Sequence, residues 1–216
     1  MLSADTAASN ALFDAARVAK VSRVIYTSST AANGELDALN DERRQNRPTD
    51  FYGATKAATE IYLRAYAAQR AFQAHVLRPG YIFGEPALPG GRVQPDQRFF
   101  DICRAVVRGE PVRLIKHDGT QFLHAQDLAQ LYVALLGHGA DFSIHYGLSR
   151  DWTSWAEIAG MAMAIAGREV AIELEDRGYG AEPCRFDVSA MQRDFGLSFP
   201  NAERLRAHPA WLMEHI

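Results

Sequence analysis

Residues 22–29, SRVIYTSS, form a short run of β-branched and aromatic side chains that ends in hydroxyl groups. Because the apolar part of this run is almost continuous, it predicts a strand covered on both faces, as in a parallel sheet. Small and apolar residues spaced three and four apart predict a helix over residues 5–19, just before the strand. The polar stretch 33–50, interrupted by Gly34 and Pro48, predicts a loop after it.

The next segments repeat the alternation of helix and strand. Alanine and isoleucine along one side predict a helix over residues 52–72, and HVLRPGYIFG predicts a second strand over residues 75–84. Strand, helix and strand in this order predict a right-handed crossover in a parallel sheet, so the fold class is α/β. The Pro- and Gly-rich segment 85–97 marks a boundary. Beyond it we expect helices at 97–109, 126–137, 154–167 and 202–214, and strands at 112–115, 142–148 and 169–174.

The composition describes a globular protein whose partners are small molecules. A chain of 216 residues with 48% hydrophobic content can bury a substantial core. Its net charge of −3 comes from dispersed charges, which gives no basic patch for nucleic acid or an anionic membrane, and no apolar run approaches a membrane span. Cys103 and Cys184 lack metal-ligand spacing, so we predict no metal site. With no targeting signal at the N-terminus, a cytoplasmic location is expected.

The stretch FYGATKAATE, residues 51–60, places Tyr52 four positions before Lys56. Residues four apart on a helix share a face, so both side chains should project into one space. A phenol has a reference pKa near 10, and a nearby ammonium favours its phenolate, which lets a phenol move protons at neutral pH.

The competing interpretation is a chance spacing on a half-buried helix. Context argues against chance, because the pair follows a strand that ends in hydroxyls, TSST at residues 27–30, and precedes an LRPG strand. Open α/β sheets bind ligands at the carboxyl ends of their strands, where these hydroxyls could polarise a carbon–oxygen bond.

Four segments in order carry a family resemblance: RVIYTSSTAANG (23–34), FYGATKAATE (51–60), VLRPGYIFGEP (76–86) and RGEPVRLIKHDGTQFLHAQDLA (108–129). Together they resemble the extended short-chain dehydrogenase/reductase family of the NAD-dependent epimerase/dehydratase type. The resemblance implies that residues 1–84 form the C-terminal part of a Rossmann-like dinucleotide-binding domain with a partial parallel sheet. Residues 85–216 would form a small α+β substrate-binding lobe, with a returning sheet strand near 142–148.

The resemblance also implies a catalytic triad of Ser29, Tyr52 and Lys56, with Ser28 or Thr30 as less favoured alternatives to Ser29. Tyr52 would be the acid/base, Lys56 would also hold the nicotinamide ribose, and Ser29 would bond the substrate oxygen.

The implied cofactor is NAD or NADP. The turn formed by Pro79, Gly80, Tyr81 and Ile82 would border the nicotinamide, and Tyr81 would also contact substrate together with Ser29 and Thr30. The family pairs corresponding helices of two subunits, so the resemblance implies a homodimer through helices 5–19 and 52–72.

The sequence departs from the family first in the pyrophosphate turn, because its sixteen glycines nowhere form the GxxGxxG pattern that seats a pyrophosphate. We therefore expect either the C-terminal part of a longer enzyme, inactive alone, or a half that has lost its cofactor site. The expected function is an NAD(P)-dependent oxidoreductase or epimerase acting on a carbonyl or secondary alcohol. The alternatives are a noncatalytic binding or scaffold protein and a nucleotide-sugar epimerase.

Two positions bear on the substrate. Tyr81 stands where the family's sugar-nucleotide epimerases usually have asparagine, and Thr120 and Gln121 stand where they have arginine. Without these groups a diphosphate loses charge-assisted hydrogen bonds. The sequence therefore favours a smaller carbonyl compound over a nucleotide sugar.

Overall fold

The structure is a computed structural model that describes residues 6–86 and 97–216. The chain divides into two compact units. The first contains Met1–Gly80, Gln126–Leu148 and Cys184–Ser198, and the second contains Tyr81–Ala125, Ser149–Pro183 and Phe199–Ile216. The sequence placed the boundary at residue 84, whereas the N-terminal segment of the first unit ends at Gly80. Besides the expected strand near 142–148, the first unit also includes the helix that follows Gln126 and the segment 184–198.

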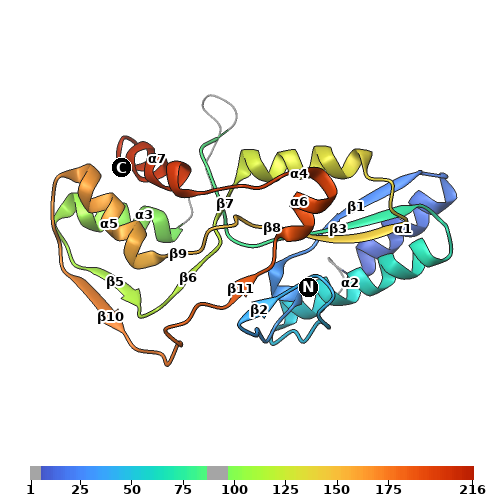
Figure 1. Cartoon of the computed structure of the whole chain (residues 1–216), viewed down its shortest axis with the longest axis horizontal. Coiled ribbons are helices and arrows are strands. Elements are labelled where there is room, and N and C mark those ends of the chain that lie inside the picture. Colours follow the sequence, from blue (N-terminus) through green and yellow to red (C-terminus); the bar gives the residue numbers. More distant parts are fainter. Residues whose placement is uncertain (1–5, 87–96) are drawn as a thin grey trace. The chain divides into compact units, whose positions relative to one another are not determined.

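The first unit is built on a three-stranded parallel sheet with the order β1-β3-β8 (Figure 1), which confirms the α/β class. Its elements are α1 (Ala8–Val18), β1 (Arg23–Thr27), the 3-10 turn η2 (Thr30–Ala32), β2 (Leu39–Asn40), α2 (Phe51–Ala68), β3 (Gln73–Pro79), α4 (Ala125–Gly137), β8 (Phe142–Gly147), β11 (Arg185–Phe186) and α6 (Ser189–Phe195). The loop expected over 33–50 contains β2, which pairs in parallel with β11.

The two faces of this sheet differ in chemistry because side chains alternate along a strand. On the face covered by α1 and α2, the buried apolar cluster consists of Phe13, Leu63, Ala67, Phe72, Ala74 and Val76. The intervening residues of β3 and β8 point to the other face, along which α4 lies in Figure 1. This second face carries His75, Leu77, Ser143 and His145.

The second unit has an α+β composition around an aromatic core. Its elements are β4 (Ile82–Phe83), α3 (Gln97–Arg108), β5 (Val112–Ile115), β6 (Gly119–Thr120), β7 (Leu123–His124), β9 (Thr153–Ser154), α5 (Trp155–Ala166), β10 (Ile172–Glu175) and α7 (Ala202–Met213). The strands pair as β4 with β7 and β5 with β10 in parallel, and β6 with β9 in antiparallel. The core is formed by α3, α5 and α7 and includes Phe99, Phe122, Trp155, Ile158 and Leu205.

One predicted strand was wrong in extent. The run 75–84 forms two strands, β3 in the first unit and β4 in the second, separated at Gly80 and Tyr81. The helices α1 to α5 and α7 lie within a few residues of their predicted ranges, whereas α6 was not predicted. Helix α5 begins with a capping box in which Ser154 and Glu157 bond each other's backbone N–H.

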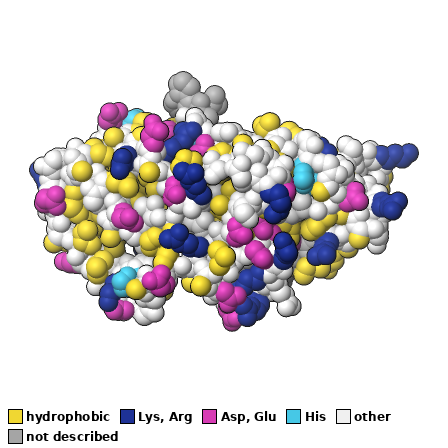
Figure 2. Space-filling view, in the orientation of Figure 1, with side chains coloured by type: hydrophobic (Ala, Val, Ile, Leu, Met, Phe, Trp, Pro, Cys, Tyr) yellow, Lys and Arg dark blue, Asp and Glu magenta, His cyan; other side chains and the backbone are white. Residues whose placement is uncertain are grey.

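The charged side chains are dispersed over the surface, as the composition indicated. Figure 2 shows acidic and basic side chains interspersed on the visible face. Among the helices of residues 6–86 and 97–216, none is both long and apolar enough to cross a lipid bilayer.

A buried ion pair joins the sheet to α2 in the first unit. Arg78 of β3 donates from Nε to Glu60 Oε1 at 2.9 Å and from Nη2 to Glu60 Oε2 at 2.6 Å, and both residues are buried. Ser28 Oγ donates to the same carboxylate, while Arg78 also reaches Asn46 Oδ1 at 2.8 Å and Asn33 Oδ1 at 3.3 Å. Burial opposes the guanidinium charge, yet the hydrogen bonds and charge of Glu60 raise the pKa of Arg78.

We predict that Arg78→Met lowers the free energy of unfolding by about 3–5 kcal/mol, because it leaves the Glu60 carboxylate buried without its partner. Urea denaturation is the measurement. Arg17→Met is the control, since it removes the exposed pair of Arg17 and Asp14, which water and salt screen, and should leave the free energy of unfolding nearly unchanged. Equal losses in the two variants would contradict the importance of the buried pair.

Candidate active site

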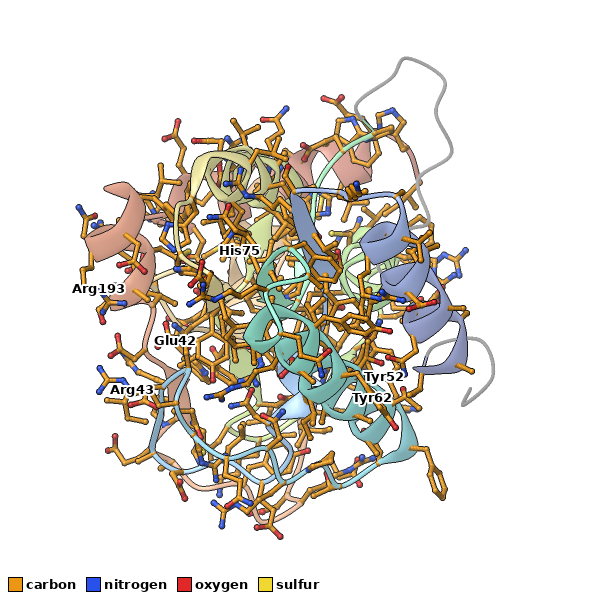
Figure 3. All side chains as sticks on the ribbon, turned by 90° about the vertical axis from the view of Figure 1, so that its right-hand side faces the viewer. Glu42, Arg43, Tyr52, Tyr62, His75 and Arg193 are labelled. Atoms are coloured by element: carbon orange, nitrogen blue, oxygen red, sulfur yellow. The ribbon has the colours of Figure 1, made fainter. Side chains whose placement is uncertain are left out.

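The helix α2 begins at a side-chain cap. The Oδ1 atom of Asp50 accepts a hydrogen bond from the Gly53 N–H at 2.6 Å, which satisfies one of the free donors of the first turn. Tyr52 and Lys56 follow in the first two turns, and the Lys56 Nζ lies 5.6 Å from the centroid of the Tyr52 ring. Tyr52, labelled in Figure 3, is 43% exposed, so part of the residue is open to a ligand.

Lys56 also contacts the carboxyl end of β1. Its Nζ donates to the Thr27 carbonyl oxygen at 3.3 Å and lies 5.3 Å from the centroid of the Tyr26 ring. An ammonium has three N–H donors, and within the described residues this is its one recorded hydrogen bond. Lys56 can therefore direct its other donors toward a ligand or toward a phenolate oxygen.

The two serine hydroxyls after β1 have different hydrogen-bond partners. Ser28 is buried and donates to Glu60, so its hydroxyl is committed to the fold. Ser29 is half-buried, and its Oγ accepts from the Ala31 N–H at 3.1 Å as the cap of η2. A hydroxyl that accepts still has a proton to donate. Of the two serines, Ser29 is the one that can donate to an incoming oxygen.

Close packing brings η2 onto the first turn of α2. Gly53 is buried, and a Cβ placed there would lie 2.9 Å from the carbonyl carbon of Ala31 and nearer still to its oxygen. The end of β3 approaches the same turn, since a Cβ on Gly80 would meet Leu148 and come within 3.6 Å of Thr30 Cγ2. The first unit thus brings together residues 29–31, the start of α2 and Gly80.

The other residues expected at the site belong to the second unit. Tyr81 packs its ring against Phe122 and Trp155, with centroids 5.1 Å away in both cases, and Ile82 pairs with Leu123. Their contacts with cofactor or substrate therefore stay predictions.

The two positions that replace the family's arginine also lie in the second unit. Gln121 is buried and donates from Nε2 to the Ser149 carbonyl at 2.9 Å, and Thr120 pairs with Thr153. Both residues have structural partners within the unit.

Two neighbours of the site escaped sequence reasoning. Tyr132 of α4 places its hydroxyl 2.6 Å from Thr27 Oγ1, next to the carbonyl that Lys56 contacts, and no local pattern in the sequence pointed to it. Glu60 did have a signal, because it stands four residues after Lys56 and so shares its helix face. A carboxylate at that position joins α2 to Ser28 and Arg78.

Gly53→Ala should lower the free energy of unfolding by about 1–3 kcal/mol, because the new Cβ would push η2 away from α2. Gly160→Ala is the matched control in α5, where a Cβ meets nothing within 4 Å and should raise stability by about 0.5–1 kcal/mol. Chemical denaturation compares the two variants. If Gly53→Ala were as stable as the unsubstituted chain, the close approach of Ala31 would be disproved.

The arrangement suits proton transfer at an oxygen atom. An exposed phenol, a neighbouring ammonium and a serine hydroxyl lie around the carboxyl end of β1, where open parallel sheets bind their ligands. Such a set can exchange a proton with an alcohol or carbonyl oxygen that the serine orients.

Comparison with known proteins agrees with this geometry. The model of the NAD dependent epimerase/dehydratase family matches residues 1–146. A dTDP-4-dehydro-6-deoxy-D-allose reductase of Streptomyces sp. is 32% identical over 79% of this chain and 52% of its own length. A UDP-glucose 4-epimerase of Corynebacterium glutamicum is 24% identical over 94% of this chain and 62% of its own length. The chain therefore spans between about half and just over three fifths of the length of these curated relatives.

A solved structure has the same fold. MoeE5 in complex with UDP-glucuronic acid and NAD superposes with a TM-score of 0.76 and 25% identity, covering 98% of this chain and 72% of that one. Because the family model covers more than half of the residues and the fold agrees, the chain belongs to the NAD dependent epimerase/dehydratase family, within the extended short-chain dehydrogenases/reductases.

Proposed function

We propose that this chain carries the acid/base site of an NAD(P)-dependent oxidoreductase or epimerase that acts on a secondary alcohol or ketone. The observation that carries the proposal is the position of Lys56, whose ammonium lies between the Tyr52 ring and the carboxyl end of β1. This geometry, rather than the spacing in the sequence alone, makes the pair suitable for chemistry. The family's dependence on NAD supports the choice of a nicotinamide cofactor.

Each residue has a role in this proposal. Tyr52 exchanges a proton with the substrate oxygen, Lys56 favours the phenolate through its charge, and Ser29 donates a hydrogen bond that orients the same oxygen. When bound, the nicotinamide supplies or accepts the hydride.

The residues present fit the nicotinamide end of the cofactor. The remaining donors of Lys56 suit the hydroxyls of the nicotinamide ribose. The GxxGxxG pattern that would seat the pyrophosphate does not occur in the sequence. The proposal therefore assigns to this chain the nicotinamide end and the proton transfer.

A nucleotide-sugar epimerase is the second candidate. It is favoured by relatives named as a nucleotide-sugar reductase and a UDP-glucose 4-epimerase. Against it stand Tyr81 and Gln121, which pack or hydrogen-bond within the second unit and do not supply the asparagine and arginine expected to contact a diphosphate. Both candidates share a secondary alcohol or ketone as the reacting group.

Tyr52→Phe should lower kcat at least about a hundredfold, because it removes the hydroxyl that moves the proton. The assay follows nicotinamide absorbance in a protein that joins this chain to a glycine-rich pyrophosphate-binding unit. Tyr62→Phe is the matched control, since Tyr62 extends from the same helix, is 50% exposed and stands ten residues beyond Tyr52 along it (both labelled in Figure 3). Lys56→Met should lower kcat and weaken cofactor binding together.

The outcomes separate the hypotheses. Normal turnover in Tyr52→Phe would remove the residue from the mechanism, and an effect of Lys56→Met on one parameter alone would remove its double role. Absence of turnover with both a nucleotide sugar and the corresponding free sugar would favour the noncatalytic scaffold. Turnover with only the nucleotide sugar would select the epimerase-type substrate class.

We also propose a homodimer formed through α1 and α2, in a reducing cytoplasm that suits the free thiols of Cys103 and Cys184. Both helices expose large apolar side chains, with Leu12 and Ile61 each 67% exposed. Exposed apolar side chains on these two helices favour burial against a second copy.

Sedimentation equilibrium at micromolar concentration should therefore show a dimer, and Ile61→Glu should weaken it at least about tenfold by placing a charge in the interface. Val133→Glu is the control, because Val133 is 68% exposed on α4, outside the proposed interface. A monomer at this concentration, or equal weakening by both variants, would exclude this dimer.

A further inference from the structure

The second face of the sheet gathers imidazoles from separate parts of the chain. His75 of β3 is paired with Ser143 of β8, and His145 follows two residues later on the same face. His138 lies just after α4, with its ring centroid 5.2 Å from that of His75 and 5.6 Å from that of His145. Asp194 of α6 completes the group by placing its Oδ2 2.9 Å from His145 Nε2.

We propose that His138, His145 and Asp194 bind a divalent first-row transition metal ion, with Zn²⁺ as the reference ion. One potential ligand atom from each residue lies within 4.8 Å of those of the other two. Zinc bonds of about 2.0–2.2 Å in tetrahedral geometry place neighbouring ligand atoms roughly 3.3 Å apart. His145 and Asp194 are already close to this separation, so an adjustment of the half-buried His138 side chain completes the site.

The donor set selects the class of ion. Two imidazoles and one carboxylate suit zinc and its neighbours, whereas calcium and magnesium prefer oxygen atoms only. Arg193 donates from Nε to Asp194 Oδ1 at 2.9 Å and from Nη2 to Oδ2 at 3.4 Å, which holds the carboxylate with its Oδ2 beside His145.

The neighbours of the site support the same assignment. Ser143 Oγ lies 3.4 Å from His145 Nδ1 and 2.9 Å from His75 Nδ1, so it can orient both rings, as residues around metal ligands do.

Packing and hydrogen bonds account for part of this cluster. The His145 ring bonds Asp194, the His75 ring bonds Ser143, and Phe195 packs against the rings of His138 and His145. His75 is fully buried, and its Nε2 has no hydrogen-bond partner among the described residues. Figure 3 shows His75 and Arg193 on the same side of the molecule, away from Tyr52.

The test is titration of the untagged, chelator-treated 216-residue chain with ZnCl2 by calorimetry near neutral pH. One ion per chain with a micromolar or tighter Kd is expected, together with a rise in Tm of about 5 °C or more at a hundredfold excess over Kd. His138→Ala and Asp194→Asn should each weaken binding at least about tenfold. His117→Ala and Cys184→Ser are the controls, because these exposed residues lie outside the cluster and should not change the Kd.

Several outcomes would overturn the proposal. These are the absence of saturable Zn²⁺ binding, an unchanged Kd in Asp194→Asn, or loss of binding in either control. Circular dichroism establishes that each variant is folded, and Asp194→Asn decides the matter if His138→Ala fails to fold. Replacing Zn²⁺ with Co²⁺ gives an independent readout, since a thiolate charge-transfer band would assign the ion to cysteine, and its absence with a tetrahedral d–d spectrum would support the His and Asp ligands.

Discussion

The buried ion pair between Arg78 and Glu60 is the interaction on which the geometry of the candidate site depends. One carboxylate accepts hydrogen bonds from the β3 arginine and from Ser28, the residue immediately before Ser29. It stands one helical turn after Lys56, so it fixes the rotation of α2 relative to the end of β1. An apolar contact could hold the two elements together, but it would not fix their rotation as directional hydrogen bonds do. The position of Lys56 beside the Thr27 carbonyl follows from this constraint.

The same pair orders a loop that has little apolar support. Asn46 donates from Nδ2 to Glu60 Oε2 at 3.1 Å and accepts from Arg78, and Asn33 donates to the Tyr146 hydroxyl at 2.7 Å. That hydroxyl in turn donates to the Asp41 carbonyl at 2.9 Å. Asn33, Asp41 and Asn46 thus anchor the polar stretch 33–50 to β3 and β8. This anchoring allows Asp50 to begin α2 at a defined place.

The sequence predicted what local patterns determine. Helix periodicity located α3, α5 and α7 to within a residue or so, and the spacing of Tyr52 and Lys56 correctly put them on one face of a helix. Features that depend on distant residues were not predictable. The run 75–84 looks like one strand, yet it continues from one unit into the other, and α6 is too short to show a clear period. Tyr132 reaches Thr27 across more than a hundred residues, and no local spacing encodes that contact.

The proposed metal site is another feature that local sequence patterns do not predict. His138, His145 and Asp194 come from the end of α4, from β8 and from α6, and so have none of the short spacing by which metal sites are recognised in sequences. Two strand spacings of about 4.8 Å separate β8 from β1, and His145 points to the face opposite α2. An ion there would lie too far from Lys56 to take part in proton transfer. Its effect would instead be structural, because three ligands would fasten the returning segment that contains α6 to the sheet.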